Sequence, residues 1–222
     1  MRTLYYHTLS PFARKVRVTM HEKHLEFEER IEEDWLQNDE FTTLNPAGEV
    51  PTLAEEDGTV VANSAAICEY LEEVYVEPSL IGETAKKRAE TRRLVGWFDS
   101  KFYREVTWTL AGQKLVKRVT QNAAPDSRAL RSGRENIHIH LSYISWLLER
   151  RTWLAGNTMT LADIAAAAHL SLVDYTGDVP WEDHSIAKDW YARIKSRPSF
   201  RGVLGDSLDG IPAAPVYADL DF

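Results

Sequence analysis

The stretch "HTLSPFARKVR", residues 7–17, joins a short run of β-forming residues to a charged segment with helical periodicity. Residues 3–8 predict a strand, and apolar residues that recur on one face from Pro11 to Lys23 predict a helix. Ser10 directly precedes a proline at the first helical position, which is a preferred N-cap arrangement. A hydroxyl at this turn can instead donate a hydrogen bond to a thiolate at the positive end of the helix. The residue pattern leaves both roles of Ser10 open.

Further strand and helix patterns follow this first pair. Residues 26–31 alternate acidic and apolar side chains, and residues 49–63 contain two β-rich runs around Asp57-Gly58, which predicts a hairpin. Residues 64–75 carry apolar side chains at helical spacing. The order β-α-β-(irregular)-β-β-α is typical of a thioredoxin-like unit. The Cys-x-x-Cys redox motif of such units is replaced by Ser10-Pro11-Phe12-Ala13, which excludes dithiol chemistry.

The pattern changes from mixed to purely helical after residue 78. We predict a thioredoxin-like α/β domain over 1–78, a linker over 79–85, an all-α domain over 86–210 and an extended tail over 211–222. Within the helical domain, helical periodicity covers residues 86–106, 125–151, 159–175 and 187–201.

Two features of the 159–175 segment indicate how its helix begins and where it lies. Thr160-x-x-Asp163 has the spacing of a capping box, and the run Ala165–Ala168 predicts close packing in the centre of the domain. His169 follows this run and is predicted to be a satisfied core residue rather than a general base. The tryptophans and tyrosines of the helical domain are expected to be mostly core residues, with a few lining a cleft between the domains; they include Trp97, Tyr103, Trp108, Tyr143 and Trp146.

Composition excludes several classes of protein. The formal net charge of −8 over 222 residues argues against nucleic acid as the main partner. A single cysteine, Cys68, excludes an internal disulfide framework and fits a reducing compartment. The sequence shows no secretory leader pattern and no apolar run of about 20 residues, so we expect a cytoplasmic protein without a membrane span. No metal site is expected, because His138 and His140 are two apart on a helix and point to different faces.

Two polar or proline-containing pairs flank the predicted hairpin. Val50-Pro51 precedes its first strand, where a proline is tolerated and a cis bond is plausible. In a thioredoxin-like unit this loop faces the N-terminus of the first helix, so the Val50 backbone can pair with a peptide-like ligand. An ordinary turn proline remains the alternative. Asn63-Ser64 follows the hairpin, and Ser64 is predicted to cap the next helix or to receive a carboxylate.

Taken together, Ser10-Pro11-Phe12, Val50-Pro51, Asn63-Ser64 and Thr160-Leu-Ala-Asp163 occur in the order and spacing of the glutathione transferases, which the chain resembles over essentially its whole length. The resemblance implies a thioredoxin-like domain followed by a helical domain, in a homodimer. It also implies that Ser10 activates the thiol of glutathione, that Val50 with Pro51 pairs with its cysteine, and that Asn63 and Ser64 contact its γ-glutamyl end.

Two departures from the family pattern concern the glutathione site. The family usually has Glu or Gln where this chain has Asn63, and that acidic or longer side chain helps to hold the ligand's ammonium. From Ile31 to Ala85 the chain has fourteen Asp and Glu and no Lys, Arg or His. Because glutathione is a net anion, this stretch predicts a poor glutathione site; screening over about 8–10 Å weakens the repulsion without reversing it.

The ending "GIPAAPVYADLDF", residues 210–222, combines prolines with alternating acidic and apolar residues. A frayed end is compatible with it, and so is a docking segment or a strap over the fold. With Trp35, this ending resembles the glutathione-transferase-like FzlA proteins of alphaproteobacteria, which bind the division polymer FtsZ. The resemblance implies an adaptor that engages FtsZ through Trp35 and the terminal residues Asp219, Leu220, Asp221 and Phe222. The alternative is an active glutathione transferase that conjugates the glutathione thiolate to a small electrophile.

Overall fold

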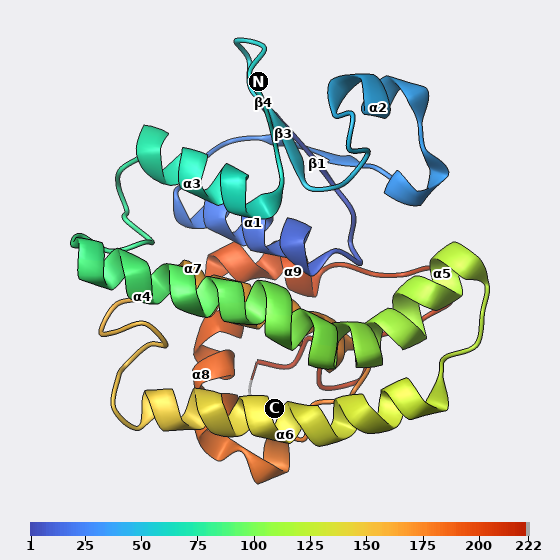
Figure 1. Ribbon diagram of the computed structural model, residues 1–222, viewed down its shortest axis with the longest axis vertical. Helices are drawn as coiled ribbons and strands as arrows, with labels where there is room; N and C mark the ends of the chain where they lie inside the picture. The colour runs from blue at the N-terminus through green and yellow to red at the C-terminus, as the bar shows by residue number, and fades with distance from the viewer. Residues whose placement is uncertain (221–222) are drawn as a thin grey trace. The chain divides into compact units, whose positions relative to one another are not determined.

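The computed structural model describes residues 1–220 of the chain. The chain divides into two compact units, Met1–Ser79 and Leu80–Phe222, and each has its own set of elements (Figure 1). Residues 221 and 222, which include two of the predicted partner contacts (Asp221 and Phe222), lie outside the described residues.

The first unit is built on a mixed four-stranded sheet with the order β2-β1-β3-β4. Strand β1 runs parallel to β2 and antiparallel to β3, and α1 packs beside α3 (Figure 1). This is the thioredoxin-like arrangement predicted from the sequence. The elements are β1 (Thr3–Tyr6), α1 (Pro11–Glu22), β2 (Glu28–Ile31), η1 (Asp34–Leu36), α2 (Asp39–Leu44), β3 (Thr52–Ala54), β4 (Val60–Ala62) and α3 (Ser64–Val74).

Two short helical elements of this unit, η1 and α2, were not predicted. They follow β2 in a region rich in acidic and amide residues, where no apolar period marks a helix. Helix α2 begins at a local signal instead, since the Asn38 side chain accepts a hydrogen bond from Glu40 N at 3.0 Å. Element η1 is important for the site because it carries Asp34 and Trp35.

The second unit is entirely helical apart from isolated bridges among its described residues. Helix α7 lies at its centre, and every residue of α7 is buried, as the alanine run predicted. The predicted capping box is confirmed, because the side chains of Thr160 and Asp163 each accept a backbone hydrogen bond from the other. The elements are α4 (Ala85–Gly96), η2 (Trp97–Val116), α5 (Lys117–Gln121), α6 (Ser127–Leu148), α7 (Leu161–Tyr175), η3 (Trp181–Asp183), α8 (Ser185–Lys195), η4 (Pro198–Phe200) and α9 (Arg201–Leu204).

Helix α4 continues without interruption into η2, a segment of π-helical hydrogen bonding that ends where Lys117 N donates to Gly112 O. None of the five aromatic residues that were expected mostly in the core is fully buried: Trp97, Tyr103 and Tyr143 are half-buried, and the other two are exposed. Trp108 is 37% exposed and Trp146 is 49% exposed. Their helices pack against neighbours through other faces, which the aromatic content of the segment does not reveal. None of the described helices is long and apolar enough to cross a membrane.

The segment after α9 is not a frayed end up to residue 217. Figure 1 shows it running along the helical unit toward α5 before it turns back. Tyr217 is 1% exposed, whereas Asp219 and Leu220 are exposed. The tail is therefore buried at Tyr217 and exposed at its last described residues.

Candidate functional site

The sheet register brings the predicted glutathione-site residues of the first unit to one edge. Tyr5 of β1 pairs with Thr52 of β3, and Thr52 pairs with Ala62 of β4. The end of β1, the beginning of β3 and the end of β4 therefore lie side by side. Ser10 follows β1, Val50-Pro51 precedes β3, and Asn63-Ser64 follows β4.

Ser10 is the N-cap of α1, which is one of the two roles that the residue pattern left open. Its Oγ accepts a hydrogen bond from Ala13 N at 3.1 Å, and its own amide donates to His7 O at 3.0 Å. A hydroxyl can accept and donate at the same time, and no residue from 1 to 220 accepts from the Ser10 hydroxyl. The cap role and the thiol-donor role are therefore compatible in geometry.

His7 is part of this site, although the sequence analysis assigned it no role. Its Nδ1 accepts a hydrogen bond from Leu9 N at 3.0 Å, and its ring meets Trp35 edge-on with centroids 4.4 Å apart. Burial, with a smaller contribution from the Arg14 guanidinium, lowers the pKa of His7 to about 4. His7 is therefore neutral at physiological pH and orders the loop rather than carrying charge. Trp35 is half-buried against it.

The Val50-Pro51 bond is cis. The Val50 amide, which the family resemblance assigns to glutathione, donates within the chain to Asp34 Oδ2 at 3.4 Å. Burial raises the pKa of Asp34, and the nearby carboxylates of Glu49 and Glu32 raise it further. The Asp34 carboxyl therefore occupies the Val50 amide that a peptide-like ligand needs. The neighbouring carboxylates disfavour the binding of another anion there.

Asn63, rather than Ser64, caps α3, so the predicted cap at Ser64 is wrong. Asn63 has a positive φ of 76°, and its Oδ1 accepts from Ala65 N at 2.9 Å and from Ala66 N at 3.5 Å. Asn tolerates this left-handed conformation better than most residues, and the cap satisfies two helix amides. Ser64 becomes the first helical residue and is buried. The Asn63 oxygen is thus committed to the helix.

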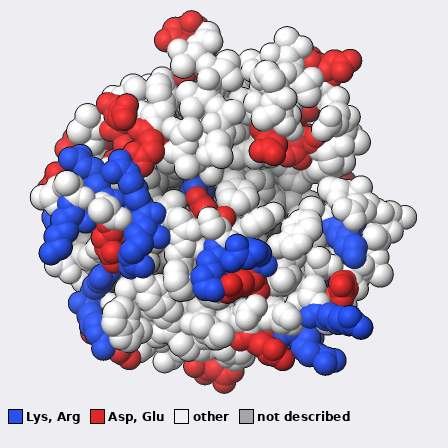
Figure 2. All heavy atoms as spheres, in the orientation of Figure 1, with Lys and Arg blue, Asp and Glu red and all other residues white. Residues whose placement is uncertain are grey.

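The charges of the chain are segregated along its length. Figure 2 shows Asp and Glu over α2 and the tip of the β3–β4 hairpin, whereas Lys and Arg gather over the first turns of α4. The lysine and arginine residues at the beginning of α4 are exposed. Within the first unit, the cation nearest in sequence to Ser10 is Arg14, whose Nε donates to Thr8 O at 3.0 Å.

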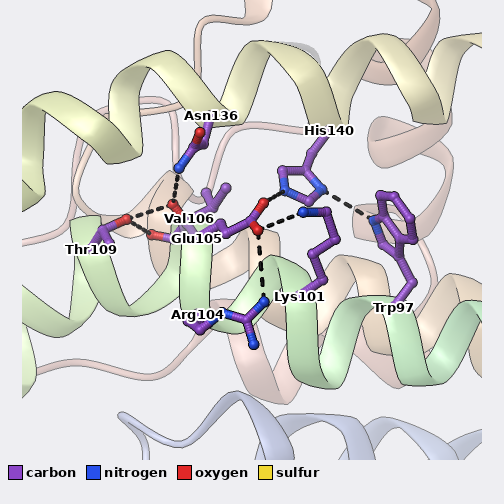
Figure 3. Close-up of polar contacts among 8 residues, drawn as sticks. All are labelled: Trp97, Lys101, Arg104, Glu105, Val106, Thr109, Asn136 and His140. Carbon is purple, nitrogen blue, oxygen red and sulfur yellow. Dashed lines mark hydrogen bonds and ion pairs between the residues drawn. The ribbon is translucent and has the colours of Figure 1, made fainter.

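A second polar cluster lies between η2 and α6 in the helical unit (Figure 3). His140 is 1% exposed, its Nε2 lies 3.1 Å from Glu105 Oε2, and its Nδ1 lies 3.1 Å from Trp97 Nε1. Because an indole N–H only donates, Nδ1 is the acceptor and Nε2–H donates to Glu105. Lys101 Nζ also donates to Glu105, at 2.5 Å. Both imidazole nitrogens are engaged, so the cluster joins two helices and has no free base for catalysis.

One other histidine, His169, has the role that the sequence predicted. His169 is fully buried and lies 3.1 Å from Thr107 Oγ1 and 3.3 Å from Asp99 Oδ1, as expected of a satisfied core residue. His138 Nδ1 lies 3.0 Å from His184 Nε2. The described residues contain no group of three or more His, Cys, Asp or Glu arranged to hold a metal ion.

The fold and the edge of the sheet define the class of protein. The model of the glutathione S-transferase N-terminal domain matches residues 9–74, and that of the C-terminal domain matches residues 64–198. The chain belongs to the glutathione S-transferase family. Over its full length it is 49% identical to FtsZ-localized protein A of Caulobacter vibrioides, of which it covers 98%.

Solved structures agree with this assignment. FzlA from C. crescentus superposes with a TM-score of 0.96 at 49% identity, covering 100% of this chain and 99% of the other. A glutathione S-transferase from Rhodospirillum rubrum F11 superposes with a TM-score of 0.98 at 61% identity and full coverage of both chains. A more distant member from Methylobacillus flagellatus, 26% identical with a TM-score of 0.75 over 91% of this chain and 98% of the other, was solved with glutathione bound.

Proposed function

We propose that this chain is a largely non-catalytic adaptor of the FzlA type, which binds FtsZ in the cytoplasm as a homodimer. The observation that carries the proposal is the full-length similarity, at 49% identity, to a protein named for its localisation with FtsZ. The glutathione transferase fold then serves as a scaffold. Its contacts are the surface around Trp35 and the C-terminal residues Asp219, Leu220, Asp221 and Phe222.

The state of the glutathione site supports an adaptor. The Val50 amide donates to Asp34, and the Asn63 oxygen caps α3. The stretch from Ile31 to Ala85 contains no Lys, Arg or His. Glutathione, which is a net anion, would therefore find the Val50 amide already hydrogen-bonded to Asp34 and would be repelled by the surrounding carboxylates.

Exposed apolar side chains around Trp35 support a protein contact there. Ile31 is 61% exposed and Leu36 is 65% exposed, on either side of a half-buried Trp35. At the other contact, Leu220 is 45% exposed beside the acidic Asp219. Apolar and aromatic side chains of this kind supply the anchors of protein interfaces.

Co-sedimentation with FtsZ polymers tests the proposal. The wild-type protein is expected in the pellet with FtsZ. A variant that lacks residues 218–222 is expected to stay in the supernatant while its circular dichroism spectrum remains that of the wild type. Trp35→Ala is expected to weaken co-sedimentation. If the wild-type protein stays in the supernatant, the adaptor role is rejected; if the shortened protein still pellets, the tail is not the contact.

An active glutathione transferase is the second candidate, and two observations favour it. The Ser10 hydroxyl still has a proton to donate, and the relative that is 61% identical is itself called a glutathione S-transferase. Ser10 would stabilise the glutathione thiolate, which would then attack a small electrophile. Isothermal titration with glutathione tests this: binding at micromolar ligand, with a thiolate ultraviolet signal that Ser10→Ala removes, supports an enzyme. Absence of binding at millimolar ligand rejects it.

A further inference from the structure

The C-terminal segment is the part of the chain that follows α9. Tyr175, the last residue of α7, holds the first half of this segment against the helical unit. The Tyr175 hydroxyl donates to Ile211 O at 2.6 Å and accepts from Leu208 N at 3.2 Å. The Tyr175 carbonyl accepts from Ala214 N at 2.8 Å. One residue of the central helix therefore holds the segment at three points.

Tyr217 fastens the second half of the segment. Its side chain is 1% exposed, its hydroxyl donates to Val203 O at 2.7 Å, and its ring meets that of Tyr175 edge-on at 5.0 Å. The chain is exposed from Ala218 to Leu220. Tyr217 is thus the last buried residue before the proposed partner contact.

Lys195 joins these two fastenings from the last turn of α8. It is fully buried, and its Nζ donates to Val216 O at 3.0 Å, directly before Tyr217. The same Nζ lies 3.6 Å from Asp174 Oδ2, while Asp174 Oδ1 accepts from Trp181 Nε1 at 2.8 Å. A buried ammonium therefore spans α7, α8 and the C-terminal segment.

Burying the ammonium of Lys195 beneath the C-terminal segment costs free energy, because the charge is taken out of water. Burial lowers the pKa of Lys195, and the carboxylates of Asp174 and Asp219 oppose that shift. Two charges taken out of water are often no more stabilising than apolar residues of the same volume, so a core of this kind does not need the pair for stability. What an apolar residue cannot do is donate a charge-assisted hydrogen bond to a particular carbonyl, which fixes the direction of the segment.

We propose that Lys195 is the positioning residue of the C-terminal segment. Its ammonium holds Val216, which keeps Tyr217 in its pocket and directs residues 218–220 outward in one orientation for the partner. The identity of that partner rests on the proposed function, whereas the fastening of the segment does not. Pre-ordering of these residues lowers the entropy cost of binding, because they are already held when the partner arrives.

The test uses the full-length protein with two variants and a matched control. Lys195→Met keeps the length and apolar stem of the side chain but removes the donor. Asp174→Asn combined with Lys195→Met removes the pair together, so that no charge is left buried without a partner. Arg193→Met is the control, because Arg193 lies on the same helix and donates to a loop carbonyl, Thr152 O at 3.0 Å, rather than to the segment.

Hydrogen exchange measured by mass spectrometry reads out the fastening. In both Lys195 variants the peptide that covers residues 211–217 is expected to exchange about ten- to hundredfold faster than in wild type, as the loss of one charge-assisted hydrogen bond implies. Peptides from α7 are expected to keep their wild-type rates in the double variant. Arg193→Met is expected to leave the segment unchanged. Wild-type exchange at 211–217 in the double variant overturns the proposal.

Co-sedimentation with FtsZ reads out the orientation. Both Lys195 variants are expected to bind FtsZ about tenfold more weakly than Arg193→Met. Faster exchange with wild-type binding overturns the positioning role, because the segment would then be loosened without consequence. If the wild-type protein itself does not bind FtsZ, the adaptor function fails, and the exchange rates alone decide whether Lys195 fastens the segment.

Discussion

Replacement of Asp163 by alanine is expected to destabilise the helical unit more than any other single change to a helix start in this chain. Asp163 is fully buried in the first turn of α7. Its Oδ1 accepts from Leu154 N at 2.9 Å and from Trp190 Nε1 at 3.0 Å, and its Oδ2 accepts from Thr160 N at 2.9 Å. One carboxylate therefore satisfies donors from a loop, a helix cap and a second helix.

The magnitude follows from the donors that alanine leaves behind. Two backbone amides and one indole N–H would stay buried without an acceptor, and each such donor costs about 1–3 kcal/mol. The Thr160 hydroxyl, 3.2 Å from Oδ2, can rotate to another acceptor and is left out. The sum is about 3–9 kcal/mol, which is a large part of the about 5–15 kcal/mol by which folded proteins are stable.

Urea unfolding followed by tryptophan fluorescence and by circular dichroism measures this loss. Asp126→Ala is the matched control, because Asp126 also accepts an amide at a helix start, from Arg128 N at 2.8 Å, but in an exposed position. The control is expected to lose about 1 kcal/mol. If Asp163→Ala lost no more than Asp126→Ala, the buried donors would not be the source of stability, and the reasoning would be refuted.

Three further predictions concern the edge of the sheet. Folding lowers the pKa of His7 from 6.5 to about 4, so the folded state favours the neutral ring. The free energy of unfolding should therefore fall by up to about 3 kcal/mol as the pH falls from 6.5 to 4. In urea titrations His7→Asn should flatten this pH dependence, and an unchanged dependence would contradict the assignment. Ser10→Ala should cost about 1 kcal/mol in unfolding free energy through the lost bond to Ala13 N, whereas Ser10→Asn should restore the cap without a hydroxyl; equal losses would argue against a cap. Asp34→Ala should release the Val50 amide and tighten glutathione binding about tenfold in isothermal titration, and no change would show that this amide does not limit binding.

Local signals predicted the elements of this fold well. The cap at Ser10, the hairpin around Asp57-Gly58 and the box of Thr160 and Asp163 each depend on residues only a few positions apart. The buried helix α7 follows from its own alanine run. The failures are also local in origin: η1 and α2 have no apolar period, and the cap of α3 moved by one residue to Asn63.

The site was predicted less completely, because its chemistry depends on pairs that are distant in sequence. The Val50 amide was predicted as a ligand donor, but its acceptor is the carboxylate of Asp34, sixteen residues earlier. His7 carried no signal, since its low pKa arises from burial and from the nearby Arg14 guanidinium, and its contact with Trp35 forms only in the folded chain. Burial and pairing of this kind appear only when the chain is folded.

The sequence by itself therefore determined the family, the order of the elements and the acidic character of the first unit, since these depend on residue types and near-neighbour spacing. Only the tertiary structure decided which polar groups remain available. It assigned the Val50 amide to Asp34, and it buried Lys195 beneath the tail and Tyr217 of the tail against the helical unit, where the sequence had left the tail either frayed or docked. The physical reason is that a donor's availability depends on the nearest acceptor in space, and hydrogen bonds between segments as far apart as Lys195 and Val216 arise from packing rather than from local pattern.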